Sequence, residues 1–219
     1  QCVSAVLVTW SLTRAYDAMK LKFRELRMDA RVLRKELKIG VPGALQACAY
    51  GVTNVVLQAS VNSFGTDTAA GWAAYGKLDM IFWTVSSALG AAVTTFAGQN
   101  YGAGKMDRVY NSIRVNVVIS YIFTGAIIIV LFEFCEPLYH MFTTDPKVIG
   151  IGVYMLRFLI PSYLLSVLLE NLSGGLRGLG DVLWPTIFTF GGLFFVRLPW
   201  IIILTKIHHK VEILLISYP

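Results

Sequence analysis

Residues 71–105 read GWAAYGKLDMIFWTVSSALGAAVTTFAGQNYGAGK, a long apolar run that ends in a polar, glycine-rich segment. The run is long enough to cross a bilayer, which takes about 20 apolar residues in a helix. It contains one acidic residue, Asp79. Because a charged side chain is costly inside a membrane, an acid at such a position indicates a functional site by default. The stretch therefore predicts a membrane protein and makes Asp79 its first candidate residue.

The composition of the whole chain also favours a membrane protein. Of its 219 residues, 56% are hydrophobic and 15% are charged, whereas soluble domains carry about 45–50% and about 25%. The net charge of +6 is concentrated near the start of the chain, where a basic segment beside apolar runs indicates topology. No basic stripe with interleaved aromatic residues lies on a polar background, so nucleic acid is not expected as a partner. The three cysteines form no CxxC motif or Cys/His cluster, so no metal site is expected.

Three segments follow from the alternation of apolar and charged stretches. Residues 1–13 are too short to cross the bilayer and predict the end of a transmembrane helix whose beginning lies outside this sequence. Residues 14–38 carry nine Lys/Arg and four Asp/Glu, with apolar residues at spacings of three and four. This pattern predicts a basic amphipathic connector helix on the cytoplasmic membrane surface; a solvated connector helix is the alternative. Residues 39–219 predict a transmembrane bundle that is truncated before its last helix.

The predicted fold is all-α, a polytopic membrane helix bundle with about five full spans. The spans are 39–64, 72–97, 108–134, 148–171 (interrupted by Pro161) and 182–205, and 211–219 leads into a sixth. Pro42 is expected in the first turn of the first span, where a proline removes no hydrogen bond. Lys and Arg are most frequent in alternate connectors, so the positive-inside rule places 14–38, 98–114 and 172–183 in the cytoplasm.

Polar residues recur every fourth position along the first full span, at Gln46, Tyr50, Asn54, Gln58 and Asn62. At 3.6 residues per turn this period drifts by about 40° per step, so the side chains form a slowly winding polar seam. Amides in hydrocarbon need partners, so the seam should face other helices or water. Asn54 and Gln58 lie nearest the middle of the membrane and are the better candidates for lining a cavity, with interhelical contacts as the alternative.

Three charged residues lie at similar depth in three different spans: Asp79, with Tyr75 one helical turn away, Arg157 and Arg197. Buried charges in membranes pair with one another or face water. We hypothesise that Asp79 forms a cluster with one arginine and the polar seam, either as a fixed ion pair or as a protonatable or cation-linked carboxylate. The predicted ion- or substrate-binding residues are Asp79, Tyr75, Asn54, Gln58, Arg157 and Arg197. Glu170, at the cytoplasmic end of its span, is predicted to be structural.

Four segments, in the same order, resemble the multidrug and toxic compound extrusion (MATE) family. GQNYGAGKMDRV at 98–109 is similar to a cytoplasmic loop of the family, and IGVPGALQ at 39–46 to the start of its seventh helix. MFTTDPKVIGIGVYML at 141–156 resembles the external loop that enters helix ten. LIPSYLLSVLLENLSGGLRGLGDVLWP at 159–185 resembles helix ten, its glycine-rich turn and helix eleven. The resemblance covers nearly the whole chain.

The resemblance implies half of a two-lobe, twelve-helix transporter in the plasma membrane. Its partners would be a missing N-terminal lobe, membrane lipid and a small cationic substrate. Members export organic cations and other amphipathic compounds in exchange for Na⁺ or H⁺ by alternating access, so no cofactor beyond the coupling ion is implied. Acids in the central cavity couple ion and substrate in many members, and Asp79 fits this role. Some members keep their principal acid in the N-terminal lobe, which would make Asp79 secondary.

Two other functions stay open. A lipid-linked oligosaccharide flippase of the same superfamily would need a more cationic cavity, which Arg157 and Arg197 could supply. A non-transporting membrane subunit is the other alternative. An intramembrane enzyme is not expected, because the spans carry no Ser/His pair or paired Asp. The glycines at 98–104 and 174–180 are predicted to form tight turns with positive φ.

Overall fold

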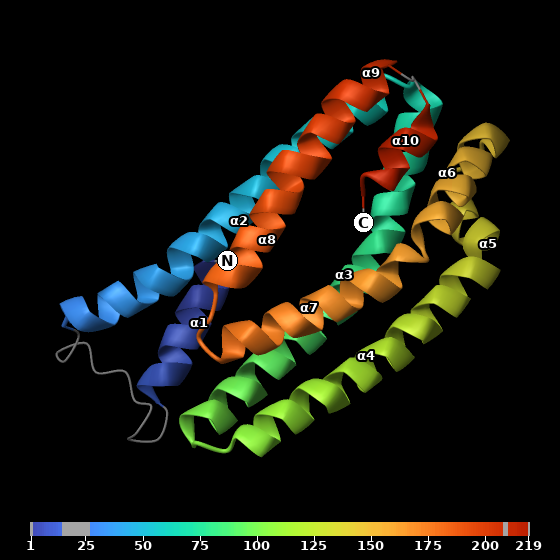
Figure 1. The fold of residues 1–219 in the computed structure, drawn as a ribbon. Helices are drawn as coiled ribbons and strands as arrows, with labels where there is room; N and C mark the ends of the chain where they lie inside the picture. Colours follow the sequence, from blue (N-terminus) through green and yellow to red (C-terminus); the bar gives the residue numbers. More distant parts are fainter. Residues whose placement is uncertain (1, 15–26, 208–209, 219) are drawn as a thin grey trace. The chain divides into compact units, whose positions relative to one another are not determined.

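The computed structural model describes residues 2–14, 27–207 and 210–218. These residues form helices and no strand, as Figure 1 shows, which confirms the all-α prediction. The chain divides into two units, 1–38 and 39–219, and each is described by itself.

The first unit contains α1 (Cys2–Thr13) and the first residues of α2 (Ala30–Asn62). α1 has 12 residues, fewer than the roughly 20 that cross a bilayer. Within the predicted connector helix, residues 15–26 lie outside the described residues. From Ala30 onward the segment is helical, but it is the beginning of α2 and not a separate helix. Pro42 accordingly lies inside α2 and not in a first turn, so one backbone hydrogen bond of α2 is missing there.

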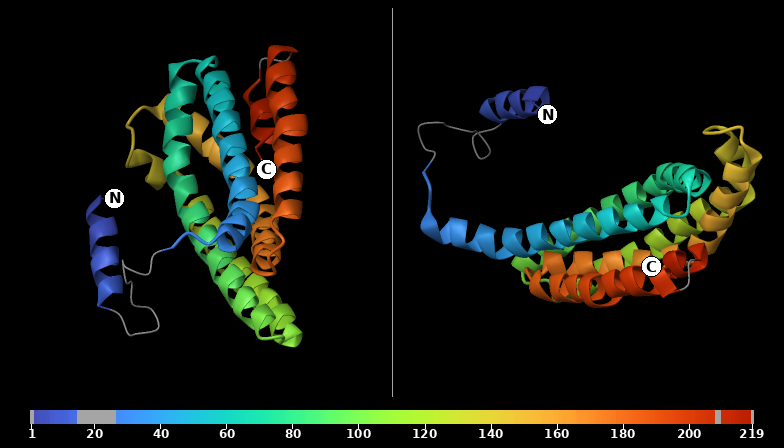
Figure 2. Two further views of the ribbon diagram at one scale, coloured as in Figure 1. Left: turned by 90° about the vertical axis from the view of Figure 1, so that its left-hand side faces the viewer. Right: turned by 90° about the horizontal axis from the view of Figure 1, so that it is seen from above.

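The second unit is a bundle in which α3 is the central helix (Figures 1 and 2). α3 packs against α4, α6 and α7, and α4 also packs against α7. The elements after α2 are α3 (Thr66–Gly102), α4 (Met106–Glu133), α5 (Cys135–His140), α6 (Pro146–Leu159), α7 (Ser162–Gly178), α8 (Leu183–Gly191), the π-helical segments η2 (Gly192–Arg197) and η3 (Trp200–Leu204), α9 (Thr205–Ile207) and α10 (Val211–Ile216).

By length and composition, three helical stretches of the described residues can cross a membrane: α3, α4 and Leu183–Leu204. α6 and α7 make a fourth if this pair, bent by 50°, counts as one span. Pro161 lies at the bend, as the sequence predicted, because proline cannot donate the backbone bond that would continue the helix. α2 is helical over the predicted first span but is not among these stretches. Its seam of amides makes it less apolar than the others.

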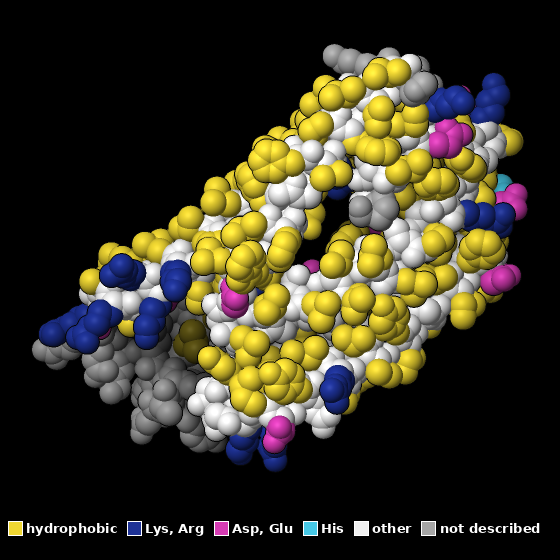
Figure 3. All heavy atoms as spheres, in the orientation of Figure 1, with side chains coloured by type: hydrophobic (Ala, Val, Ile, Leu, Met, Phe, Trp, Pro, Cys, Tyr) yellow, Lys and Arg dark blue, Asp and Glu magenta, His cyan; other side chains and the backbone are white. Residues whose placement is uncertain are grey.

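Hydrophobic side chains cover much of the helix surfaces of the second unit, and charged side chains lie mainly toward the helix ends (Figure 3). A soluble protein of this size would bury such surfaces in its core, whereas a bilayer solvates them. The surface therefore agrees with a membrane protein.

α3 is longer than predicted and includes most of the glycine-rich segment. Gln99 and Asn100 are helical, and the turn to α4 is confined to residues 103–105, where Gly104 has a φ of 71°. In the second glycine-rich segment, only Gly180 has a positive φ, 83°. The prediction that these glycines mainly form turns was therefore wrong for the others, which are helical.

Several of the helical glycines allow α3 and α7 to approach backbone to backbone. A Cβ atom on Gly178 would lie 2.6 Å from the carbonyl oxygen of Thr94, and one on Gly174 would lie 2.8 Å from that of Gly90. The Thr94 hydroxyl donates to the Gly174 carbonyl at 2.9 Å. Small residues play this part in membrane helix pairs because lipid provides no hydrophobic force that drives helices together. We call this contact the glycine seam.

The glycine seam predicts a large difference between two glycine-to-alanine changes. Gly178→Ala is expected to lower the free energy of unfolding by about 1–3 kcal/mol, because the new methyl group overlaps α3 backbone. Gly125→Ala in α4 is the matched control, since its Cβ would meet no atom within 4 Å. Thermal unfolding of the full-length protein in detergent measures both. Equal melting temperatures would show that α3 and α7 are not in close contact.

Candidate functional site

Asp79 lies in the middle of α3, on the face that packs into the bundle. Buried residues of α3 recur at helical spacing along this face, so Asp79 points inward and not toward lipid. Its side chain is 6% exposed. A carboxylate in such surroundings needs strong hydrogen bonds to replace water. The neighbours of Asp79 therefore determine what the site can do.

Three tyrosine hydroxyls donate hydrogen bonds to the Asp79 carboxylate. Tyr75 and Tyr163 donate to Oδ1 at 3.1 and 2.7 Å, and Tyr218 donates to Oδ2 at 2.8 Å. Hydrogen bonds to an ionised acceptor are stronger than neutral ones. Because the donors come from α3, from the start of α7 and from the residues after α10, the carboxylate joins three parts of the chain. We call Asp79 with these tyrosines the tyrosine clamp.

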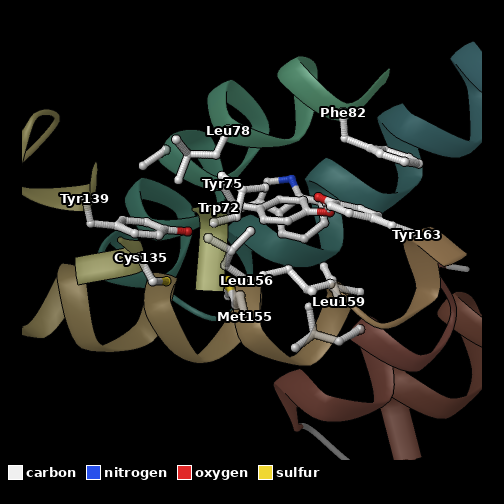
Figure 4. Close-up of a cluster of buried hydrophobic side chains, with 14 of the residues drawn as sticks. Trp72, Tyr75, Leu78, Phe82, Cys135, Tyr139, Met155, Leu156, Leu159 and Tyr163 are labelled. Atoms are coloured by element: carbon white, nitrogen blue, oxygen red, sulfur yellow. Dashed lines mark hydrogen bonds between the residues drawn. The ribbon is translucent and has the colours of Figure 1, made fainter. Parts of the chain in front are cut away.

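Aromatic packing fixes the rings of the tyrosine clamp. Tyr163 stacks on Phe82 with 4.0 Å between ring centroids and 3° between planes. Trp72 lies against Tyr75 at 4.9 Å, and the edge of Tyr218 meets the Tyr75 ring at 5.9 Å. In Figure 4, Tyr75 and Tyr163 meet at one side of the buried cluster, and Tyr139 and Cys135 lie at the other. The clamp is thus built into the hydrophobic core.

Arg197 lies beside the clamp but does not pair with Asp79. Its guanidinium sits over the Tyr218 ring, 4.9 Å from the centroid, so Tyr218 contacts both charged residues. The side chain is 9% exposed, and its Nε and Nη2 atoms have no hydrogen-bond partner. Nε and Nη2 form one edge of the guanidinium, the edge that binds a carboxylate or phosphate through two parallel bonds. Arg197 also ends the π-helical segment η2, a conformation frequent at functional sites.

Among the described residues no ion pair joins Asp79 to an arginine, so the fixed ion pair, one of the two alternatives for the predicted cluster, is not formed. Tyrosine hydroxyls take the place of the cation, because the phenol ring fills an apolar core while its hydroxyl still supplies a donor. Arg157 is exposed and stacks over Phe132 at 5.1 Å. Among the described residues, the ion pair that forms is Glu170–Arg177, at 2.6 Å. This contact agrees with the structural role predicted for Glu170.

The polar seam of α2 has mixed surroundings. Asn54 and Gln58 are both exposed on this chain, and Gln58 donates to Asn62 at 2.9 Å within α2. Gln46 donates to Thr189 of α8 at 3.1 Å, which is an interhelical contact. No hydrogen bond of the described residues joins Asn54 or Gln58 to Asp79. In Figure 3 a hollow lies between the α8 side of the unit and α7, and acidic and basic side chains are visible in it.

Sequence reasoning missed Tyr163 and Tyr218, which make the shortest bonds to Asp79. Tyr75 could be found because it precedes Asp79 by one turn. Tyr163 is 84 residues and Tyr218 139 residues from Asp79, so no local spacing indicates them. The one signal is that Tyr163 follows Pro161, the residue of the bend.

A second buried polar contact joins α3, α4 and α7. The Asn171 amide oxygen accepts from Ser120 at 3.2 Å and from Asn116, and Asn116 also donates to the Leu89 carbonyl at 3.1 Å. All its members are neutral, so it provides helix–helix contacts and no charge. Among the described residues, no group of His, Cys, Asp and Glu could hold a metal ion.

Comparisons with known proteins agree on one family. The family model MatE matches residues 42–203. The chain is 29% identical to the probable multidrug resistance protein YoeA of Bacillus subtilis, over 90% of this chain and 42% of that protein. It is 28% identical to the probable multidrug resistance protein NorM of Thermotoga maritima, over 78% and 37%. The chain thus spans less than half the length of these relatives.

Solved structures show the same fold. A MOP superfamily transporter from Pyrococcus furiosus superposes with a TM-score of 0.85 at 16% identity, covering 98% of this chain and 48% of that one. An outward-facing multidrug resistance MATE family transporter superposes with a TM-score of 0.85 at 16% identity, covering 99% and 49%. The described fold is therefore about half of such a transporter.

Proposed function

Because this chain belongs to the MATE family, we propose that it forms the C-terminal lobe of a secondary active efflux transporter. The transporter exports organic cations or other amphipathic compounds in exchange for Na⁺ or H⁺. The observation that carries this proposal is the tyrosine clamp, a buried carboxylate held by three neutral donors and, among the described residues, by no ion pair. Such a carboxylate is able to accept a proton, a sodium ion or an organic cation, because no fixed positive charge neutralises it.

Binding at Asp79 would act on helix packing through the tyrosines. A proton or Na⁺ on the carboxylate reduces its negative charge, so the hydrogen bonds that the hydroxyls of Tyr163 and Tyr218 donate to it become weaker. The bonds from α7 and from the segment after α10 then weaken, whereas Tyr75 stays on the same helix as Asp79. An ion that binds two conformations with different affinity shifts the balance between them, which is what alternating access needs.

The substrate side of the proposal rests on the aromatic residues of the clamp. Aromatic faces beside a carboxylate attract an organic cation by charge and by cation–π interaction. Asn54 and Gln58, exposed on this chain, would line the cavity shared with the N-terminal lobe, since exposed amides are unfavourable against lipid. The complete transporter would lie in the plasma membrane, with 98–114 and 172–183 in the cytoplasm.

Arg197 favours a second candidate function, the movement of an anionic lipid-linked oligosaccharide. The unpartnered Nε–Nη2 edge of its guanidinium fits a phosphate. This function would use Arg197 as the substrate contact, whereas drug export would use Asp79. Arg157, exposed over Phe132, supplies no second cation beside Arg197.

Transport by the full-length protein distinguishes the two functions. Liposomes with the purified protein should expel ethidium when an inward Na⁺ or H⁺ gradient is imposed, and dissipating that gradient should stop efflux. Testing the two ions separately identifies the coupling ion. Transbilayer movement of a lipid-linked pyrophosphate sugar without ethidium efflux would contradict drug export and favour the flippase. Liposomes without protein give the background rate for both assays.

A further inference from the structure

A groove of about 460 Å³ lies between α3 and α4, away from the tyrosine clamp. α3 contributes Ala92 and Phe96 to its lining, and α4 contributes a stripe that runs from Arg108 to Ile119. The residues of the stripe recur at spacings of one and three, so one side of α4 faces the groove over three helical turns. The groove thus follows the helix axis.

The chemical character of the groove changes along its length. Arg108 lies in the first turn of α4, and Asn111 and Ser112 follow one turn later. Beyond them the lining is mostly apolar and includes Phe96 and Ile119. The eleven helical steps from Arg108 to Ile119 span about 16 Å at 1.5 Å per residue. This length matches one leaflet of the roughly 30 Å hydrocarbon core.

The polar end of the groove carries a positive charge that forms no ion pair within the part of the chain that the structure describes. Arg108 is exposed, and the ion pair among the described residues joins Glu170 to Arg177. Asn111 adds amide donors, and the Ser112 hydroxyl donates to the Val109 carbonyl at 2.7 Å. Guanidinium and amide donors are suited to phosphate oxygens. By charge, the same end repels an organic cation.

We propose that this groove binds an anionic phospholipid of the leaflet that contains the α3–α4 turn. Its phosphate would contact Arg108 and Asn111, and one acyl chain would lie against Phe96 and Ile119. Basic pockets between membrane helices on the cytoplasmic side bind anionic head groups, and the distribution of Lys and Arg assigns the α3–α4 turn to that side. The proposal does not rest on the transport function, because it needs only that α3 and α4 lie in a bilayer.

Native mass spectrometry of the full-length protein tests the lipid site. The protein is released from bilayers of equal phosphatidylglycerol and phosphatidylcholine, and bound lipids are counted. Wild-type protein should retain phosphatidylglycerol in preference to phosphatidylcholine. Arg108→Gln should reduce that preference about fivefold, the effect of one cation near a membrane surface. Arg114→Gln is the matched control, since Arg114 is on the same helix and exposed but does not line the groove.

A second variant tests the apolar half without changing charge. Ala92→Phe fills the groove from α3 and should reduce retention of both lipids, while the melting temperature of delipidated protein stays at the wild-type value because Ala92 is exposed. Equal losses from Arg108→Gln and Arg114→Gln would overturn the proposal and show diffuse attraction to the surface. If Ala92→Phe reduced the binding of ethidium but not the retention of phosphatidylglycerol, the proposal would also be overturned. The groove would then be a site for substrate.

Discussion

Asp79→Asn is expected to abolish ion-driven ethidium efflux in the full-length protein and to leave the protein folded. Asparagine keeps the shape of aspartate but cannot take up a proton or neutralise a cation at neutral pH. Bonds donated to the remaining amide oxygen change from a charged type worth about 1.5–3 kcal/mol to a neutral one worth about 0.5–1.5 kcal/mol. A tyrosine hydroxyl that faces the new NH2 group must accept a hydrogen bond instead of donating one. Efflux should therefore fall to the rate of protein-free liposomes, and the melting temperature should decrease.

Asp67→Asn at the start of α3 is the matched control, since the same change is made outside the core on the same helix. It should leave efflux and its ion dependence at the wild-type level. If Asp79→Asn kept ion-dependent efflux, the carboxylate would serve only as an acceptor that holds three tyrosines in place. Coupling would then belong to another acid.

Arg197→Met should raise thermal stability and at the same time remove transport. A buried charge without a partner costs several kcal/mol, and the Nε and Nη2 atoms of Arg197 have none. Methionine keeps most of the volume of the side chain and removes this cost. Because Arg197 destabilises the conformation described here, we expect it to be needed in another conformation. The variant should therefore lose ethidium efflux, or the movement of sugar-lipid if that is the function.

Arg157→Met is the control for the loss of a positive charge near the same predicted depth. Arg157 is exposed and stacks on Phe132, so its replacement should change the melting temperature little. Thermal unfolding and liposome transport measure both variants. A lower melting temperature for Arg197→Met would show that the contact with the Tyr218 ring outweighs the cost of the unpaired charge.

The sequence was a good guide to the helices and to one half of the site. Apolar length and proline position predicted the helical bundle and the bend at Pro161, because both depend on local chemistry. The same reasoning placed Tyr75 beside Asp79, since four residues make about one turn. It failed for the start of the first span, because Pro42, interpreted as a first-turn proline, lies inside α2, where the connector and the span form one helix.

The rest of the site depends on contacts between distant segments. Charge and depth indicated an arginine as the partner of Asp79, but depth alone does not say which helix faces overlap. Three tyrosines met the need for donors, and two of them lie on other segments. The glycines were likewise assigned to turns, because an isolated sequence cannot distinguish a glycine that needs a positive φ from one that needs room for a neighbouring helix.

The glycine seam also constrains how the proposed transporter would move. α3 and α7 are in contact through main-chain atoms near Gly90 and Gly178, and such a contact leaves no room for sliding or rotation. The two helices should therefore travel as one rigid body, carrying Asp79 and Tyr163 together. Of the three donors in the clamp, Tyr218 alone lies outside this body. A change of hydrogen-bond partner at Asp79 would then first form or break the bond from Tyr218, and so bind or release the C-terminal segment.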